Sequence, residues 1–570
     1  MRRIGVFVCH CGTNIAGSVD VERVAKEMRA YPQVAFATDY KYMCSDPGQN
    51  LIKEAIQEHK LDGVVVSACS PTMHEVTFRR TTESAGVNPY QCEIANIREQ
   101  VSWVHQDDQE AATRKAIETI RTIVEKVRYN ESLVPFYLPL VKRALVIGGG
   151  IAGMTAALDI ADGGYPVVLV ERTDRLGGNM ARLSRGYVNF DDANDLLGRR
   201  LERVTHHPNV QVLTNSEVTE VGGYVGNFNA QVNARSNGAT EPFSFDVGAI
   251  VVATGYELYA QENLGEYGGG RYPDVVDGLQ FESMLASPNG LRRPSDGQEP
   301  KEVVWVQCAG SRDPALHRPY CSKICCMYVA KQTIAYKQRV PDGQAYVMYI
   351  DIRSPGRGYE EFVQTAMADY GVLYLRGKAS KVFQEGGNGQ VTVWGVDTLS
   401  GQNVEVEADL VVLASAAVSA EGSVELGQRI RSAVDEHGFF SEAHPKLRPV
   451  ESNTAGIYLA GAAHFPKDIP ESVAQASGAA SKVLGLFAQR QMVQEPIVAY
   501  VDPELCSACG LCVPACPYEA RAMHPWKPVA TVNAALCQGC GACAVACPNK
   551  ASQVRNFTPY QVMAMMDAYL

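Results

Sequence analysis

Residues 142–178, KRALVIGGGIAGMTAALDIADGGYPVVLVERTDRLGG, constrain the fold of this chain more than any other stretch. The apolar run Leu145–Ile147 has the length of a buried parallel strand. It is followed by a GxGxxG motif made of Gly148, Gly150 and Gly153. These glycines permit a tight turn, a close approach of the backbone to a pyrophosphate, and close packing of the next helix. The order of strand, turn and helix predicts a βαβ unit that binds a dinucleotide.

The residues beyond the helix support this prediction. The apolar run 166–170 ends at Glu171, about 20 residues after the glycines, where an acidic side chain can accept hydrogen bonds from a ribose. The alternative is a glycine-rich turn that binds no ligand. RLGG at 175–178, ATG at 253–255 and GIYLAG at 456–461 resemble segments of the two-dinucleotide flavoproteins. This resemblance favours FAD over NAD.

The resemblance also implies a set of FAD-binding residues besides the three turn glycines, namely Glu171, Arg172, Gly177, Gly178, Asn179, Ala253, Thr254, Gly255, Gly461, Lys467, Asp468 and Ile469. The chain departs from the flavoprotein pattern after Gly461. An aspartate near the ribityl chain is usual there, whereas this sequence has Ala462 and Ala463. The ribityl contact is therefore expected from elsewhere in the chain.

Composition narrows the class of protein. A chain of 570 residues is long enough for three or four domains. Its net charge of −11 argues against nucleic-acid binding, which requires a basic face. No apolar run approaches the 18 or so residues of a membrane span, and the N-terminal apolar run is too short for a signal peptide. We therefore expect a cytoplasmic protein whose cysteines bind metal and do not form disulfides.

Residues 1–130 are predicted to form a small α/β domain with cysteines at the ends of its elements. Cys9, Cys11, Cys44 and Cys69 lie in such loops, where binding sites are usually built. Four thiolates can ligate an iron–sulfur cluster; buried apolar thiols and a reactive thiol pair are the alternatives. Cys92 is expected to be a core residue.

The second nucleotide domain of two-dinucleotide flavoproteins opens with a strand and another GxGxxG. Here a predicted strand at 302–307 is followed by four cysteines, and no second GxGxxG occurs; the cysteines are Cys308, Cys321, Cys325 and Cys326. Neighbours on a helix do not share a face, so adjacent cysteines are poor candidates for two inert core residues. We predict an iron–sulfur cluster that exchanges single electrons with the flavin, in place of a nicotinamide nucleotide. A zinc site and a redox-active disulfide are the alternatives.

A duplicated cysteine motif closes the chain. The run C-x2-C-x2-C-x3-C-P recurs 31 residues later, with the spacing of bacterial two-cluster ferredoxins. In that pattern the fourth cysteine of each run ligates the other cluster. One [4Fe–4S] cluster is therefore assigned to Cys506, Cys509, Cys512 and Cys547, and the other to Cys537, Cys540, Cys543 and Cys516.

Together these segments resemble the A subunit of heterodisulfide reductase. The segments that carry the resemblance span nearly the whole chain: GVFVCHCGTNIAG, YKYMCSDPGQ, ACSPTMHE, GGGIAG, CAGSRDP with CSKICC, FPKDIPESVAQ and the paired ferredoxin runs. The resemblance implies an oxidoreductase with FAD and four [4Fe–4S] clusters, including one at each of the first two cysteine sets. It also implies that Lys331 approaches flavin N5 as the catalytic residue, against the alternative of a solvated surface lysine.

The resemblance further implies electron bifurcation between a two-electron donor, a disulfide-type acceptor and low-potential ferredoxin. The implied partners are B- and C-type subunits, a hydrogenase, formate dehydrogenase or NADH-linked donor module, ferredoxin, and a second copy of the chain. Methanogen members carry a further ferredoxin insert, but no cysteine lies between Cys92 and Cys308 here. A linear relay without bifurcation therefore remains open. An NAD(P)H-dependent disulfide oxidoreductase and a ferredoxin-bearing scaffold without FAD remain open as well.

The expected fold class is α/β, with a thioredoxin-reductase-like two-dinucleotide FAD fold between an N-terminal α/β cluster domain and a C-terminal two-cluster ferredoxin domain. The predicted boundaries are 1–130 for the N-terminal domain, 140–300 and 445–495 for the FAD domain, 301–444 for the inserted domain, and 496–570 for the ferredoxin domain.

Overall fold

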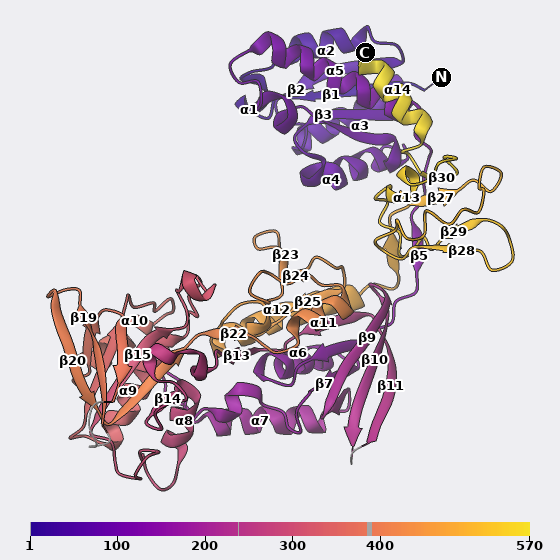
Figure 1. Ribbon diagram of the computed structural model, residues 1–570. Helices are drawn as coiled ribbons and strands as arrows, with labels where there is room; N and C mark the ends of the chain where they lie inside the picture. Colours follow the sequence, from indigo (N-terminus) through magenta and orange to yellow (C-terminus); the bar gives the residue numbers. More distant parts are fainter. Residues whose placement is uncertain (1, 237–238, 385–389, 570) are drawn as a thin grey trace. The chain divides into compact units, whose positions relative to one another are not determined.

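The computed structural model describes residues 2–236, 239–384 and 390–569 (Figure 1). The chain forms two compact units. Residues 1–138 and 493–570 make up the first, and residues 139–492 the second. In the described parts of the chain, no helix is both long enough and apolar enough to span a membrane.

The N-terminal domain is built on a four-stranded parallel sheet in the order β2-β1-β3-β4. β1 (Ile4–Cys9) and β3 (Gly63–Ala68) are buried along their whole length, as inner strands covered on both faces must be. The other elements are β2 (Val34–Tyr40), β4 (Cys92–Asn96), α1 (Thr13–Ala16), α2 (Val21–Arg29), α3 (Asp46–His59), α4 (Pro71–Ser84) and α5 (Gln109–Arg128). Asp20 caps α2 and Ser45 caps α3 by accepting backbone N–H bonds.

The ferredoxin segment packs on this N-terminal domain within the first unit. Its elements are short: β27 (Ala499–Val501) pairs with β30 (Ser552–Val554), β28 (Arg521–Met523) pairs with β29 (Ala530–Val532), and α13 (Ala542–Val545) and α14 (Pro559–Tyr569) follow the second motif and end the chain. α14 lies against α5. Tyr560 meets Tyr129 edge to face at 4.9 Å, and Gln561 donates to the Asn130 side chain at 2.9 Å. The two predicted domains therefore share one compact unit.

The second unit contains two sheets of similar design. The first has the order β23-β24-β25-β12-β6-β7-β8 and is parallel from β25 to β8. Its strands are β23 (Glu442–His444), β24 (Arg448–Ser452), β25 (Ile457–Leu459), β12 (Ala249–Val252), β6 (Ala144–Ile147), β7 (Val167–Val170) and β8 (Val210–Leu213). Helices α6 (Ile151–Asp162), α7 (Ala193–His206) and α12 (Ile469–Phe487) pack on one face. A meander of β9 (Ser216–Tyr224), β10 (Asn227–Ser236) and β11 (Ala239–Val247) packs on the other.

The second sheet is parallel in the order β14-β21-β15-β16-β17. Its strands are β14 (Val275–Asp277), β21 (Leu410–Ser415), β15 (Glu302–Ala309), β16 (Gln344–Tyr349) and β17 (Leu373–Arg376). One face carries α8 (Gly278–Ala286), α9 (Cys325–Arg339) and α10 (Tyr359–Ala368). The other carries β18 (Ala379–Phe383), β19 (Val391–Asp397) and β20 (Gln402–Ala408).

The second sheet begins and ends earlier in the chain than the predicted insert of residues 301–444. β14 and α8, which the prediction placed in the FAD domain, belong to it. The chain returns through β22 (Ala417–Ser419), which pairs with β13 (Tyr256–Leu258). α11 (Ser423–Ile430) then packs on the FAD-domain sheet. The chain passes from the FAD domain to the second sheet and back again at short strands that carry no sequence motif. Residue patterns alone therefore did not locate these two domain boundaries.

Candidate functional site

The glycine turn has the geometry that its sequence predicts. Gly148 has φ +108°, and a Cβ there would lie 2.3 Å from the backbone oxygen of Ala253. A Cβ on Gly153 would lie 1.8 Å from the oxygen of Gly148. Gly150 caps α6, and a Cβ there would meet nothing within 4 Å. The N–H groups at the start of α6, which have no partner within the helix, therefore face open space, as a phosphate site requires.

The acidic residue after β7 supports this turn. Glu171 is 8% exposed, and its carboxylate accepts the backbone N–H of Gly149 at 2.7 Å and of Thr173 at 2.8 Å. Arg172 pairs with Glu257 and donates to the backbone oxygen of Glu421. The carboxylate of Glu171 therefore holds the turn in place and lines the space beside it.

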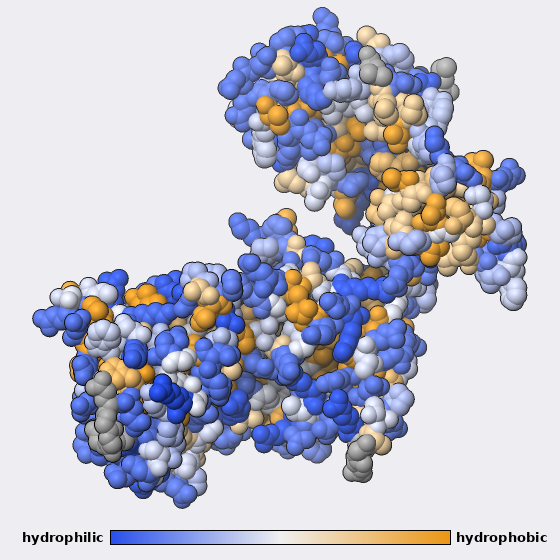
Figure 2. Space-filling model, viewed as in Figure 1, coloured by the Kyte–Doolittle hydropathy of each residue, from blue (hydrophilic) through white to orange (hydrophobic). Residues whose placement is uncertain are grey.

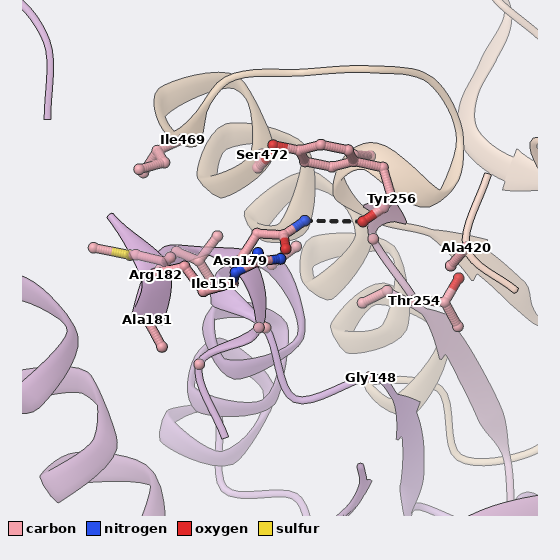
Figure 3. Close-up of a pocket in the computed structure, with 18 of the residues that line it drawn as sticks. Gly148, Ile151, Asn179, Ala181, Arg182, Thr254, Tyr256, Ala420, Ile469 and Ser472 are labelled. Carbon is pink, nitrogen blue, oxygen red and sulfur yellow. Dashed lines mark hydrogen bonds between the residues drawn. The ribbon is translucent and has the colours of Figure 1, made fainter. Parts of the chain in front are cut away.

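A cavity of about 1410 Å³ opens in front of the turn. It exceeds the 300–1,000 Å³ of common ligand pockets, as an extended dinucleotide requires. All the predicted FAD-binding residues line it except Gly153 and Gly461, whose role is packing. A Cβ on Gly461 would lie 2.7 Å from that of Ala152. Figure 3 shows Asn179 donating to the backbone oxygen of Tyr256, at 2.8 Å.

The cavity wall contains a buried hydroxyl that has no hydrogen-bond partner among the described residues. It is Oγ1 of Thr254, in the ATG segment after β12. Leaving a buried polar group unpaired costs about 1–3 kcal/mol, so a polar ligand would stabilise this wall. The cavity size, the space beside Gly150 and this free hydroxyl all fit a bound FAD.

Lys331 lies in the cavity wall and is not a solvated surface lysine. Its side chain, on α9, is 2% exposed and forms an ion pair with Glu282 of α8, which is equally buried. Burial lowers the pKa of Lys331, and the charge of Glu282 opposes that shift. Glu282 also accepts from Gln332 Nε2 at 2.7 Å and from Ser184 Oγ at 2.8 Å. Sequence reasoning missed Glu282, although a charged residue within the apolar pattern of 278–286 was a usable signal.

A second charged corner of the cavity lies at the start of α12. Asp468 caps this helix in a capping box with Glu471 and accepts the Tyr359 hydroxyl at 2.6 Å. Lys467 is half-buried, and desolvation lowers its pKa to about 8, while the charges of Glu442 and Glu471 act in the opposite direction. An aspartate, Asp468, therefore does line the cavity, although it lies several residues after the position at which the flavoprotein pattern has its aspartate.

The cysteines of the second sheet gather beside this cavity. Cys308, with φ +58°, lies one residue before the end of β15, and Cys325 and Cys326 begin α9. Burial raises the pKa of all three, that of Cys326 to about 11, and thiol charges, including that of Cys321, raise them further. In every pair among the four cysteines, the charge of one thiolate raises the pKa of the other thiol, so all four lie close together. Ile324 and Tyr328 flank Cys325 and line the cavity, so the cysteine set adjoins its wall.

Polar groups surround these thiols as a cluster would require. The backbone N–H of Lys323 donates to Cys321 at 3.2 Å, and that of Arg353 donates to Cys326 at 3.4 Å. The buried polar atoms nearby that have no partner among the described residues include Gln307 Nε2, Ser311 Oγ and Tyr374 Oη. Such donors are suited to the sulfur atoms of a bound cluster.

The N-terminal cysteines also gather in one place. Burial raises the pKa of Cys9 and raises that of Cys69 to about 11, and the charge of Cys11 contributes to both shifts. Cys44 contributes to that of Cys9. Cys9 and Cys69 therefore lie near Cys11, and Cys44 lies near Cys9. Arg98 Nη1 donates to the sulfur of Cys11 at 3.4 Å. Cys92 lies in the core at 1% exposure, as expected.

In the ferredoxin segment, one small cavity of about 20 Å³ is lined by four of the eight cysteines. They are Cys506, Cys509, Cys512 and Cys547, the ligand set predicted for the first cluster. Backbone N–H groups donate to the thiols of Cys516, Cys537 and Cys547 at 3.3–3.4 Å. In the described residues, no three His, Cys, Asp or Glu side chains converge on a single metal-ion position.

Comparison with known proteins agrees with these features. Residues 112–287 match the pyridine nucleotide-disulphide oxidoreductase family, and residues 499–522 and 530–552 match the 4Fe-4S binding domain. The iron-sulfur A subunit 2 of the CoB--CoM heterodisulfide reductase of Methanopyrus kandleri is 40% identical, over 91% of this chain and 90% of its own. The A subunit of the H(2):CoB-CoM heterodisulfide,ferredoxin reductase of Methanothermobacter thermautotrophicus is 38% identical over the same shares. The thioredoxin reductase of T. acidophilum, 16% identical, covers 61% of this chain and 100% of its own with a TM-score of 0.42.

The two relatives thus match 91% of this chain at 38–40% identity. This extent of similarity exceeds what a shared fold alone produces. The chain is an oxidoreductase and belongs to the family of heterodisulfide reductase A subunits.

Proposed function

We propose that this chain is the FAD and iron–sulfur electron-transfer subunit of a heterodisulfide-reductase-like complex. The observation that carries the proposal is the cysteine set of residues 308–326 beside the large cavity. In a two-dinucleotide fold the second sheet would present a nicotinamide nucleotide at this place. Here no second glycine motif follows β15, and four cysteines lie instead at the end of β15, in the loop after it and at the start of α9.

FAD is the ligand proposed for the cavity, because it exchanges electrons both in pairs and singly. The glycine turn and the N-terminus of α6 would hold the pyrophosphate, and Glu171 would bind the ribose. Lys331 would place a cation beside the reacting ring and stabilise its negatively charged reduced form. Glu282 would keep that lysine in position through their buried ion pair.

We propose four [4Fe–4S] clusters, one for each gathered cysteine set. Two belong to the ferredoxin segment, where the duplicated spacing and the cavity around the first ligand set support them. The other two are supported by the coupled thiols near Cys11 and by those of residues 308–326. Their side-chain environments supply thiolates and N–H donors in the numbers such clusters use.

The proposed reaction is flavin-based electron bifurcation. A two-electron donor would reduce the flavin, and the two electrons would then pass singly, one toward a disulfide-type acceptor and one toward low-potential ferredoxin. The name of the Methanothermobacter relative joins the heterodisulfide and ferredoxin as its acceptors, which supports this assignment. The proposed partners are B- and C-type subunits, a hydrogenase, formate dehydrogenase or NADH-linked module, ferredoxin, and a second copy of this chain.

An exposed apolar surface on the ferredoxin segment supports partner binding (Figure 2). Trp526 and Val545 are 89% and 90% exposed, and Leu505 and Leu511 are also exposed. Clusters of exposed apolar residues commonly mark protein–protein contacts. Cys509 and Cys540 of the two ligand sets are exposed on the same segment, so a partner there could exchange electrons with either cluster.

A linear electron relay without bifurcation is the second candidate. No cysteine lies between Cys92 and Cys308, so no further cluster is provided in that stretch. The alignment with the Methanopyrus relative spans 594 positions, more than the 570 residues of this chain, so the relative contains residues that have no counterpart here. Without such a segment, the chain has one path fewer by which clusters could pass electrons to a low-potential acceptor.

The test is anaerobic purification of the chain with its co-purifying subunits, followed by flavin and iron analysis. We expect one FAD and about 16 iron atoms per chain, as four [4Fe–4S] clusters require. Ferredoxin reduction that requires simultaneous reduction of a disulfide acceptor supports bifurcation, whereas reduction of either acceptor alone supports the relay. Absence of flavin, or direct bleaching of the flavin by NADPH in the isolated chain, contradicts the proposal.

A further inference from the structure

One buried arginine in the ferredoxin segment faces the first cysteine set and has no anionic partner in the part of the chain that the structure describes. Arg521 is 5% exposed and lines the cavity formed by Cys506, Cys509, Cys512 and Cys547. Its Nη2 donates to Ser552 Oγ at 2.9 Å. Its Nε and Nη1 have no hydrogen-bond partner among the described residues. A buried guanidinium with two unpartnered nitrogens at a cavity indicates that an anionic group occupies that cavity.

The internal repeat shows that this arginine is an asymmetry between two equivalent positions. Arg521 stands five residues after Cys516, the last cysteine of the first run. Ser552 stands five residues after Cys547, the last cysteine of the second run. The two equivalent residues hydrogen-bond to each other, and both are buried. One half of the repeat therefore contributes a fixed positive charge, and the other contributes a neutral hydroxyl.

This difference in charge has a redox consequence. Reduction adds one electron, and thus one negative charge, to an iron–sulfur cluster. A nearby cation and N–H bonds to the cluster sulfurs stabilise the reduced form, which raises the reduction potential. Low dielectric inside the protein strengthens both effects.

We propose that Arg521 raises the reduction potential of the cluster held by Cys506, Cys509, Cys512 and Cys547 above that of its neighbour. An electron that enters the ferredoxin segment then rests on this cluster. Arg521 acts through its charge and the free N–H groups of Nε and Nη1, and the duplicated motif alone would make the clusters nearly equivalent. This inference rests on the proposed presence of the two clusters, and it concerns a residue outside both ligand sets.

The test is a redox titration of the intact chain, followed by electron paramagnetic resonance, with a chemical reductant as the electron source. In Arg521→Gln we expect the first cluster to become harder to reduce by at least tenfold in its equilibrium constant, or about 59 mV for a one-electron couple. The second cluster should shift much less. Arg521→Lys, which keeps the charge but loses the paired donors, should shift in the same direction by a smaller amount. Cys509→Ser alters a ligand of the first cluster and so identifies its signal.

Arg555→Gln is the matched control, because this arginine lies in the same segment but is 44% exposed and pairs with Glu131 at 3.7 Å. It should leave both potentials unchanged. Unchanged potentials in an Arg521→Gln protein with full iron content overturn the inference, as do equal shifts of both clusters. If Arg521→Gln binds less iron than the parent chain, the Arg521→Lys variant becomes the test. Reduction potentials in Arg521→Lys that equal those of the parent chain would then overturn the inference. Absence of both cluster signals from the parent chain would instead contradict the proposed function.

Discussion

The buried ion pair of Lys331 and Glu282 gives the sharpest prediction for the large cavity. Replacing Lys331 with Met leaves the Glu282 carboxylate buried at 2% exposure. Breaking such a pair from one side costs about 3–5 kcal/mol. Glu282 keeps hydrogen bonds from Gln332 and Ser184, so we expect a loss near the lower end, about 3 kcal/mol. Glu282→Gln should destabilise by a similar amount, because it leaves the lysine unpaired.

The double variant Lys331→Met/Glu282→Gln removes both charges and should lose much less than the sum of the two single losses. Urea unfolding of the full chain measures these free energies. Trp305 reports on the second sheet, because it is fully buried and bonds to Gln332 at 3.2 Å, whereas the other three tryptophans, all within the described residues, are exposed. If the loss of unfolding free energy in the double variant equals the sum of the two single losses within about 0.5 kcal/mol, the coupling between Lys331 and Glu282 is refuted.

The same substitution tests the proposed place of Lys331 beside the flavin. Loss of the cation should make the flavin harder to reduce, by on the order of tenfold, without abolishing FAD binding. Lys337→Met is the matched control, because Lys337 lies on the same helix, α9, but does not line the cavity. A flavin titration that is identical in the parent and both variants would remove Lys331 from the proposed mechanism.

Three further predictions follow from single positions. The pKa of Lys467 is lowered to about 8 in the folded chain against 10.5 unfolded, so the unfolded state binds more protons between these pH values and stability rises with pH. Across this pH window, urea unfolding should show that the parent chain gains up to about 3 kcal/mol of unfolding free energy relative to Lys467→Met. A difference between the two proteins that does not change with pH would contradict this prediction. Cys325→Ser should lower iron from about 16 to about 12 atoms per chain, with Cys92→Ala at the parental value; iron analysis checks both. Gly150→Ala should keep the apoprotein fold but weaken FAD binding, measured by calorimetry, at least tenfold, because its Cβ would enter the phosphate space. Gly153→Ala should instead lower the melting temperature of the apoprotein, because its Cβ would clash with the backbone. Equal melting temperatures of the two variants would contradict these separate roles of the two glycines.

Much of the candidate site was predictable because its chemistry is local. The GxGxxG turn requires glycine for backbone reasons visible within six residues, and Gly148 and Gly153 show the expected close contacts. The strands around it were read from short apolar runs, and the parallel sheet confirms the α/β fold. The family assignment from the cysteine segments is confirmed by the relatives from Methanopyrus and Methanothermobacter. The individual ligand and cofactor residues stay predictions, which the variants above test.

The features that could not be predicted depend on residues far apart in the chain. Glu282 pairs with Lys331 across two helices, and nothing in either local pattern specifies the partner. The bounds of the inserted sheet depend on β14 and β22, short strands whose place is set by the strands they pair with.

The sequence by itself determined the kinds of site in this protein, because ligand spacing and glycine geometry act over a few residues. Only the tertiary structure decided which further charges stand beside those sites, as with Glu282 at the large cavity and Arg521 at the first ferredoxin ligand set. The physical reason is that a buried charge takes its partners from whatever the packed chain brings next to it, and packing joins elements that no local pattern links.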